Sequence, residues 1–402
     1  MREATQRALV ARLLAHIEHG TTDRAPAERT VAADTYAGAE RLEHERRTVL
    51  RRRPVVLAHS SQLAAAGDFV TDRVDGRPLL AVRGADGGVR AFLNVCRHRG
   101  AQLVEAEDGT AAKGFSCRTH AWRYGLDGAL AHVPDRDRCF SPAALEGRDL
   151  LPVPVVERYG FVWLAPRPSG PGPLADPLGG RLADLDEDWS AFRFADDTLW
   201  ATDRLVGRFN WKLGVEGFLE VYHFRSLHPD MQKYVFVPEV ALFDRLGEHV
   251  RIVAPKREIR ELRDVPPEQR LLRPHATLVY FVFPSTFVFV EKRHVTTLRI
   301  QPLTDESSEV RVLHTARRDG LLRPDALRTN IDLFSKVLAE DVAAAESVQR
   351  GLASAPQELL FGRNEAGLHY FRDSLAQAAE GEDRAPVDGR EGGVPEREGA
   401  GE

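Results

Sequence analysis

Two short blocks of cysteine and histidine constrain this 402-residue chain more than any other feature of its sequence. One residue separates Cys96 from His98 in the first block, two residues separate Cys117 from His120 in the second, and eighteen residues lie between the blocks. Thiolate and imidazole are the side chains that hold zinc and iron–sulfur groups in proteins. Since the whole chain has only 3 Cys and 14 His, chance is a poor explanation. The spacing predicts a metal site where two turns meet.

Two kinds of metal group fit these four side chains. A tetrahedral zinc ion accepts two thiolates and two imidazoles, but the usual zinc finger pairs Cys with Cys and His with His. Here each block supplies one of each, which favours a two-iron cluster in which one iron takes both thiolates and the other both imidazoles. A zinc site formed by the same four side chains remains the alternative interpretation. The third cysteine, Cys139, belongs to neither block and is predicted to be a passive, small apolar residue.

A second candidate metal site contains His223 and His228, which are five residues apart. Five residues turn an ideal helix by about 500°, which leaves the two side chains about 140° apart, so the helix must unwind between them. Pro229, directly after the second histidine, fits a helix that has ended. Such a pair is more often structural than metal-binding. An open iron site would need one carboxylate more, and Glu340 and Asp341 on a late helix are the candidates.

Composition and charge describe an ordinary globular protein, with 43% hydrophobic and 29% charged residues. A formal charge of −5 gives no electrostatic reason to expect nucleic acid or an anionic membrane as a partner. No apolar run is long enough to span a membrane, and the charged amino terminus predicts an amphipathic helix rather than a signal peptide. Few cysteines suit a reducing compartment, so we expect a cytoplasmic protein.

The rest of the sequence divides into zones. Residues 1 to about 48 predict helices, and residues 54–166 contain short β-rich runs between Gly, Asp-Gly and Pro turns, typical of a small all-β domain. A Pro/Gly-rich connector, 166–180, follows, and then a helical segment around 210–226. Strand-like runs between 277 and 315 and a helix over about 324–350 predict an antiparallel sheet with helices against one face. Because the first three runs alternate imperfectly between apolar and polar residues, the sheet is predicted mainly from β-branched and aromatic content. The acidic tail has no aromatic residue and is predicted to be disordered.

The sequence resembles the catalytic (alpha) subunits of the Rieske non-haem iron oxygenases, the aromatic ring-hydroxylating dioxygenase family. The resemblance covers about residues 40–375 and is specific only in short blocks. These blocks are 96–101, 117–124 with Asp127-Gly128, 210–229 and, more loosely, 338–351.

The resemblance implies two iron centres. A [2Fe-2S] cluster would be held by Cys96, His98, Cys117 and His120, with Trp122 beside it, although Trp122 equally suits an ordinary core position. A mononuclear Fe(II) would be held by His223, His228 and Asp341, the last favoured over Glu340.

Two further residues are predicted to be catalytic by the same resemblance, Asn210 and Glu220. In the family an acidic residue at the second position, usually aspartate, bridges an iron ligand of one subunit and the cluster histidine of its neighbour, here His120. Because Glu220 lies three residues before His223, we expect both on one helical face. A solvent-facing helix residue is the alternative for Glu220.

The implied fold is α+β, with an all-β Rieske domain inserted before a helix-grip catalytic domain of antiparallel sheet and helices. We expect an amino-terminal helical segment packed on the catalytic domain (1–48), the Rieske domain (49–166), the catalytic iron domain (167–379) and the acidic tail (380–402). The candidate pocket walls are Phe218, Leu219, Phe224, Leu227, Phe281, Phe283, Phe287 and Phe289. Most of them are expected to belong to the core and about a third to contact substrate.

The implied activity is O2-dependent hydroxylation, as mono- or dioxygenation, of an apolar or aromatic small molecule. No nucleotide-binding Gly-x-Gly-x-x-Gly follows a strand, so electrons would come from a separate NAD(P)H-dependent reductase, directly or through a ferredoxin. A homotrimer is expected, with a beta subunit left open. The alternatives are an oxidative O- or N-demethylase of the same family, and a non-catalytic electron-transfer or zinc-binding protein.

Overall fold

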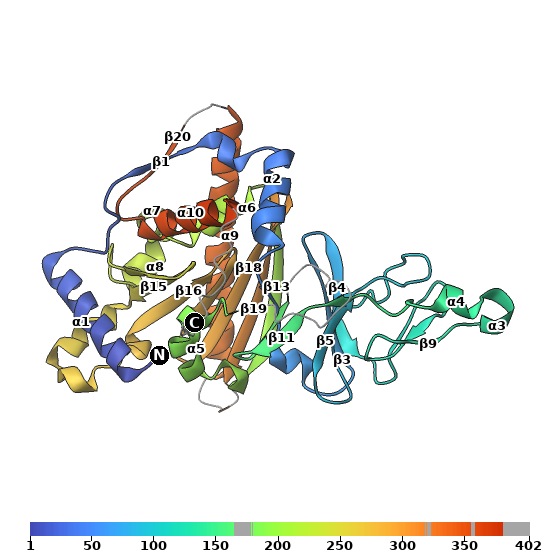
Figure 1. Cartoon of the computed structure of the whole chain (residues 1–402). Coiled ribbons are helices and arrows are strands. Elements are labelled where there is room, and N and C mark those ends of the chain that lie inside the picture. Colours follow the sequence, from blue (N-terminus) through green and yellow to red (C-terminus); the bar gives the residue numbers. More distant parts are fainter. Residues whose placement is uncertain (165–177, 179, 318, 320–322, 355–357, 381–402) are drawn as a thin grey trace, which may run out of the picture.

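The computed structural model describes residues 1–164, 178, 180–317, 319, 323–354 and 358–380. A body built on one large sheet carries a smaller β-rich lobe, which projects to the right in Figure 1. This arrangement confirms the expected α+β class with the lobe preceding the sheet domain in the chain. Most of the predicted connector and nearly all of the predicted acidic tail lie outside the described residues.

The lobe consists of three small antiparallel sheets, with strand orders β10-β5-β4-β3-β6, β11-β12-β2 and β7-β8-β9. Asp75 and Gly76, both in the left-handed region, form the tight turn between β3 and β4, as expected for an Asp-Gly hairpin. The elements are β2 (Val55–His59), η3 (Ser60–Leu63), β3 (Asp68–Val74), β4 (Arg77–Arg83), β5 (Val89–Leu93), β6 (Asp108–Thr110), β7 (Phe115–Ser116), β8 (Arg123–Tyr124), β9 (Leu130–His132), α3 (Arg136–Cys139), α4 (Pro142–Leu145), β10 (Pro152–Val153), β11 (Val155–Arg158) and β12 (Phe161–Leu164).

The body is a seven-stranded antiparallel sheet in the order β13-β19-β18-β17-β16-β15-β14. Its strands are β13 (Asp197–Gly207), β14 (Leu242–Leu246), β15 (His249–Pro255), β16 (Ala276–Val282), β17 (Thr286–Val290), β18 (His294–Thr304) and β19 (Ser307–Arg317). Its helices are α5 (Asp186–Phe192), α6 (Trp211–Gly217), α7 (Phe224–Leu227), α8 (Pro229–Tyr234), α9 (Pro324–Ser354) and α10 (Ala366–Ala379), with the short turns η4 (Ala183–Leu185), η5 (Phe194–Asp196), η6 (Arg257–Asp264), η7 (Pro267–Gln269) and η8 (Arg273–His275).

Both faces of this sheet are buried, whereas the sequence predicted helices against one face only. Along β16, Leu278 and Tyr280 join a core that includes α1, α5 and lobe strands, while Val279 and Phe281 join a core that includes α6, α9 and α10. A strand covered on both sides has no polar face. This explains why apolar and polar residues alternate so poorly in the sequence of these strands.

The amino-terminal segment packs on the body and also contacts the lobe, through an ion pair between Arg46 and Asp75. The helix α1 (Glu3–His19) buries one apolar stripe, as predicted. The strand β1 (Arg29–Ala32), which the sequence did not predict, pairs antiparallel with β20 (Glu358–Phe361). A four-residue strand whose partner lies more than three hundred residues away along the chain leaves no recognisable pattern in the nearby sequence. The segment continues through η1 (Ala33–Tyr36), α2 (Ala39–Glu45) and η2 (Arg46–Leu50).

Lobe and body meet at a buried carboxylate. Asp72 on β3 accepts hydrogen bonds from Arg299 on β18 at 2.6 Å, and Arg311 on β19 lies 2.8 Å from its other oxygen. The Asp72 side chain is only 1% exposed. In the described part of the chain, no helix combines the length and apolarity needed to cross a bilayer.

Candidate metal centres and substrate cavity

The four predicted ligands of the first metal site lie on two turns of the same shape. Cys96 follows β5 and Cys117 follows β7. In each turn the cysteine N–H donates to the carbonyl five residues later, and the N–H four residues later donates back to the cysteine carbonyl. Gly100 and Ala121 occupy this fourth position, both in the left-handed region, with φ of 81° and 54°. The glycine suits that conformation, and the turns bring both blocks together as the spacing predicted.

The four side chains pair by type, as a two-iron cluster requires. The two thiols contact each other, and the imidazole rings of His98 and His120 have centroids 4.6 Å apart. One zinc ion, with bonds of about 2.0–2.3 Å, would keep all its ligands within about 4.6 Å of one another. Among the described residues, the one set of three or more such ligand atoms within 4.8 Å lies in the body, not in this lobe. The donors fit a [2Fe-2S] group better than zinc.

Aromatic side chains enclose the cluster ligands on one side. Trp122 is 3% exposed and stacks on His98, with centroids 4.7 Å apart and planes within 9°. Phe140 meets both rings edge-on. The predicted place of Trp122 beside the cluster ligands is therefore what the structure shows. Cys139, predicted to be a passive, small apolar residue, is exposed at the end of α3.

The second pair of histidines flanks a break in the helix, as the spacing required. The predicted helix over 210–226 is in fact α6, which ends at Gly217, followed by turns and the single-turn α7. His223 immediately precedes α7, and His228, with φ of −123° and ψ of 59°, separates α7 from α8. Their ring centroids are 5.1 Å apart. Unwinding turns both imidazoles toward one point, where Asp341 on α9 completes the set within 4.8 Å.

The neighbouring acidic residues of α9 take different positions. The Asp341 carboxylate lies 2.8 Å from His228 Nε2 and 3.6 Å from His223 Nε2. Glu340 lies at the other nitrogen of the His228 ring, where its carboxylate accepts a hydrogen bond from Nδ1 at 2.7 Å. Two imidazole nitrogens and one carboxylate are the donor set of an open non-haem Fe(II) site, so these residues fit that ion. Glu340 belongs to the carboxylates that orient ligand histidines, a role that the sequence did not reveal.

Glu220 supports the other histidine. Its carboxylate contacts His223 Nδ1 and accepts from the His223 backbone N–H at 3.1 Å. The expectation of a shared helical face was wrong, because α6 has already ended and the two residues meet through a turn. With carboxylates at both Nδ1 atoms, each ring keeps its Nε2 for a metal.

Asn210, predicted to be catalytic, lies at the amino-terminal end of α6. Its side-chain oxygen caps α6 by accepting from Lys212 N–H at 3.1 Å, and its amide donates to the Asp305 carbonyl at 2.8 Å. It is 2% exposed and does not line the cavity described next. The described contacts give it the role of a helix cap.

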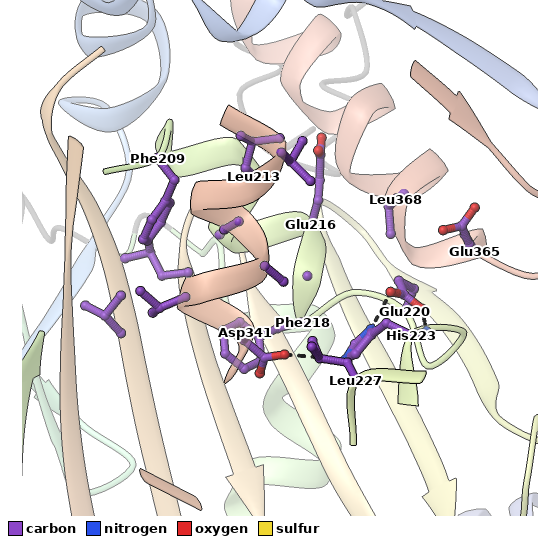
Figure 2. A pocket seen from close by; sticks show the side chains of 18 of the residues that line it. Phe209, Leu213, Glu216, Phe218, Glu220, His223, Leu227, Asp341, Glu365 and Leu368 are labelled. Atoms are coloured by element: carbon purple, nitrogen blue, oxygen red, sulfur yellow. Dashed lines mark hydrogen bonds and ion pairs between the residues drawn. The ribbon is translucent and has the colours of Figure 1, made fainter. Parts of the chain in front are cut away.

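A cavity of about 250 Å³ opens beside His223 and Asp341, between α6, α9 and the start of α10 (Figure 2). Of the eight predicted wall residues only Phe218 and Leu227 line it. Phe281 and Phe287, among the others, are fully buried in the core. Sequence reasoning missed the walls from α9 and α10, because that required knowing which face of each helix meets the sheet. These missed walls are Val342, Ala344, Ala345, Val348, Glu365 and Leu368.

Buried ionic contacts hold the cavity wall formed by α6. Glu216 accepts from the Tyr36 hydroxyl at 2.8 Å and pairs with Arg372 at 2.5 Å. Burial raises the pKa of Glu216, and Arg372 opposes that rise. One turn earlier, Lys212 pairs with Glu45 at 2.6 Å. The helix before the metal-binding turn is thereby fixed from both the amino-terminal segment and α10.

The sequence matches two described families in the expected order. Residues 53–154 match the Rieske [2Fe-2S] domain, and residues 194–381 match the ring hydroxylating alpha subunit (catalytic domain). The carnitine monooxygenase oxygenase subunit of Escherichia coli (strain K12) is 36% identical over 210 residues, 52% of this chain and 54% of that protein. The large oxygenase component of the 2,4-dinitrotoluene dioxygenase system of Burkholderia sp. (strain RASC) is 34% identical over 48% of this chain and 43% of that protein.

The chain thus spans about half the length of the curated relatives it matches. Solved structures extend the likeness. The quaternary ammonium Rieske monooxygenase CntA in complex with L-carnitine has a TM-score of 0.73 at 25% identity, covering 87% of this chain and 95% of that one. Naphthalene 1,2-dioxygenase from Rhodococcus sp., at 21% identity, shares the fold with a TM-score of 0.69 over 94% and 98%. Two converging sets of metal ligands, two matching families and a shared fold place this chain in the Rieske non-haem iron oxygenase family, among its catalytic (alpha) subunits.

Proposed function

We propose that this chain is the oxygenase component of a system that hydroxylates a small, largely apolar molecule with O2. The observation that carries the proposal is the convergence of His223, His228 and Asp341 beside a cavity with mostly apolar walls. At about 250 Å³ the cavity lies just below the usual range of about 300–1,000 Å³ for ligand pockets, so the substrate is small. Electrons would come from a separate NAD(P)H-dependent reductase, directly or through a ferredoxin.

The residues that would hold the two cofactors are the two sets described above. Cys96, His98, Cys117 and His120 would hold the [2Fe-2S] cluster, and His223, His228 and Asp341 would hold Fe(II). When bound, these groups supply single electrons and O2 activation.

The chain itself supplies orientation and exclusion of water. Glu220 and Glu340 keep both Nε2 atoms turned toward Asp341. The metal would have ligands on one side only, which leaves room for O2 and substrate. Apolar walls such as Phe218 and Val342 keep the substrate out of water next to that open side.

Oxidative N- or O-demethylation is the second candidate, because hydroxylating a methyl group on nitrogen or oxygen gives an unstable product that loses formaldehyde. Among the relatives, those named carnitine monooxygenase act on a compound of this kind. The same iron site serves both reactions, so the substrate decides between them.

Labelled oxygen tests the proposal. Purified chain should contain iron and acid-labile sulfide, and with reductant, 18O2 and a panel of small apolar and N-methylated compounds it should release products carrying label or formaldehyde. Mass spectrometry counts the labelled atoms. Colourless protein with stoichiometric zinc, or no labelled product together with no release of formaldehyde, would rule the activity out.

Glu220 would also link two copies of the chain. The cluster loops lie far from the cavity within one chain, toward the end of the lobe marked by β9 and α3 in Figure 1. A head-to-tail trimer would bring His120 of the partner subunit to Glu220, so that electrons cross between subunits.

Glu220→Gln should keep both metal centres but slow oxidation of the pre-reduced cluster about 10–100-fold in a single-turnover experiment. Glu239→Gln, an exposed residue paired with Arg225, should react like the wild type. An unchanged rate in Glu220→Gln would remove Glu220 from the electron path.

A further inference from the structure

The acidic side chains that line the cavity differ in what they contact. Glu216 pairs with Arg372, and Glu220 and Asp341 each contact a metal-site histidine. Glu365 is the exception, since among the described residues no Lys, Arg or His lies within ion-pair distance of it. No Lys or Arg lines the cavity among those residues either.

Glu365 lies directly before α10, and one of its two carboxylate oxygens has a hydrogen-bond donor. One oxygen accepts from the backbone N–H of Gly362. Burial raises the pKa of this carboxyl, and the charges of Glu220 and Glu216 raise it further, while the Gly362 hydrogen bond and His223 lower it without cancelling the rise. Within the view of Figure 2, Glu365 lies on the Glu220 side of the cavity, away from Asp341.

An unpaired carboxylate among other acids in a mostly apolar cavity is unfavourable without a compensating cation. A cation in the cavity would offset that cost, while a neutral aromatic substrate would leave it in place. The apolar walls beside Glu365, including Leu359, Leu368 and Phe218, can contact alkyl groups attached to such a cation. The Phe218 ring can add a cation–π contact.

We propose that Glu365 is a specificity-determining residue that selects substrates with a positively charged, alkyl-substituted nitrogen. The inference rests on the proposed function in one respect, that this cavity is the substrate site. It goes beyond that function by naming the charge of the substrate and the side chain that recognises it. The carbon atoms next to the nitrogen would then be the ones presented to the iron site.

A pair of isosteres isolates the charge. Choline carries a trimethylammonium group, and 3,3-dimethylbutan-1-ol has the same shape with carbon in place of the charged nitrogen. Calorimetric titration of the full-length, metal-loaded protein without O2 should show choline binding at least ~10-fold more tightly than the neutral alcohol. In Glu365→Gln this preference should fall to about twofold or less, with affinity for the alcohol unchanged. The glutamine keeps an oxygen that can accept from Gly362.

Glu358→Gln serves as the matched control, because Glu358 is an exposed glutamate on β20 that does not line the cavity. It should retain the full preference for choline. Equal affinities for both probes in the wild type, no binding of either probe, or a preference that survives in Glu365→Gln would each overturn the proposal. Binding is measured without turnover, so these outcomes leave the oxygenase activity standing, and a failed 18O2 experiment leaves this inference standing.

Discussion

Replacing Asp341 with Ala should abolish product formation and remove the mononuclear iron while the visible spectrum of the cluster stays intact. Among the residues that the structure describes, Asp341 is the one carboxylate with an oxygen near the Nε2 atoms of both His223 and His228, at 3.6 and 2.8 Å. Two imidazoles alone would hold Fe(II) weakly, since the ion prefers a mixed nitrogen and oxygen donor set. Iron analysis, the visible spectrum and product assays on the same preparation check all three expectations.

The adjacent residue provides a sharp comparison. Glu340 touches the far nitrogen of His228, so Glu340→Gln should keep the iron but lower its affinity about 10–100-fold, the usual cost of losing a carboxylate behind a ligand histidine. Asp332→Asn, an exposed acid on the same helix, should behave like the wild type. Iron retained in Asp341→Ala but lost in Glu340→Gln would show that the two roles are reversed.

Asp72→Ala should destabilise the protein by about 3–5 kcal/mol, because it leaves two buried guanidinium groups facing each other without a carboxylate. Arg299 and Arg311 come from the body, whereas Asp72 comes from the lobe. The free energy of unfolding, from urea denaturation followed by intrinsic tryptophan fluorescence, measures the loss. Asp86→Asn, which removes an exposed ion pair with Arg90 in the same lobe, should change little.

The stabilisation that Asp72 provides should decrease as the pH falls. Burial alone would raise the pKa of Asp72, but Arg299 and Arg311 outweigh it and hold the pKa below its ordinary value. A carboxyl whose pKa is lower in the folded state than in the unfolded state stabilises the folded state at pH values above its unfolded pKa. This stabilisation is lost as the pH falls through the folded-state pKa. The difference between wild type and Asp72→Ala should therefore be full at neutral pH and shrink in acid. A difference of under about 1 kcal/mol at pH 7 would mean that the Asp72 contact contributes little to holding the lobe on the body.

The metal ligands were predictable because their signals are short and local. Each cysteine–histidine block lies within one turn, and the five-residue spacing of His223 and His228 is incompatible with a continuous helix whatever surrounds it. The carboxylate was harder, because Glu340 and Asp341 are neighbours of similar chemistry. Only the rotation of α9 against His228 decides which of them faces the metal site.

Other features depend on long-range packing. Asn210 caps a helix, and most of the candidate phenylalanine walls fill the core, as was expected of most of them. The strand β1 forms only because β20 lies beside it. The poor alternation of the sheet reflects burial on both faces, which depends on where α1, α5 and the lobe pack.

From its sequence alone this chain could be recognised as an α+β protein with two sets of metal ligands, because covalent spacing and backbone geometry limit what such short motifs can do. The tertiary structure alone decided which acid faces the histidines, which side chains line the cavity and which carboxylate in it has no cationic partner among the described residues. These properties depend on contacts between residues far apart in the chain, such as His228 with Asp341 or Tyr36 with Glu216, and packing of the whole fold is what brings those residues together.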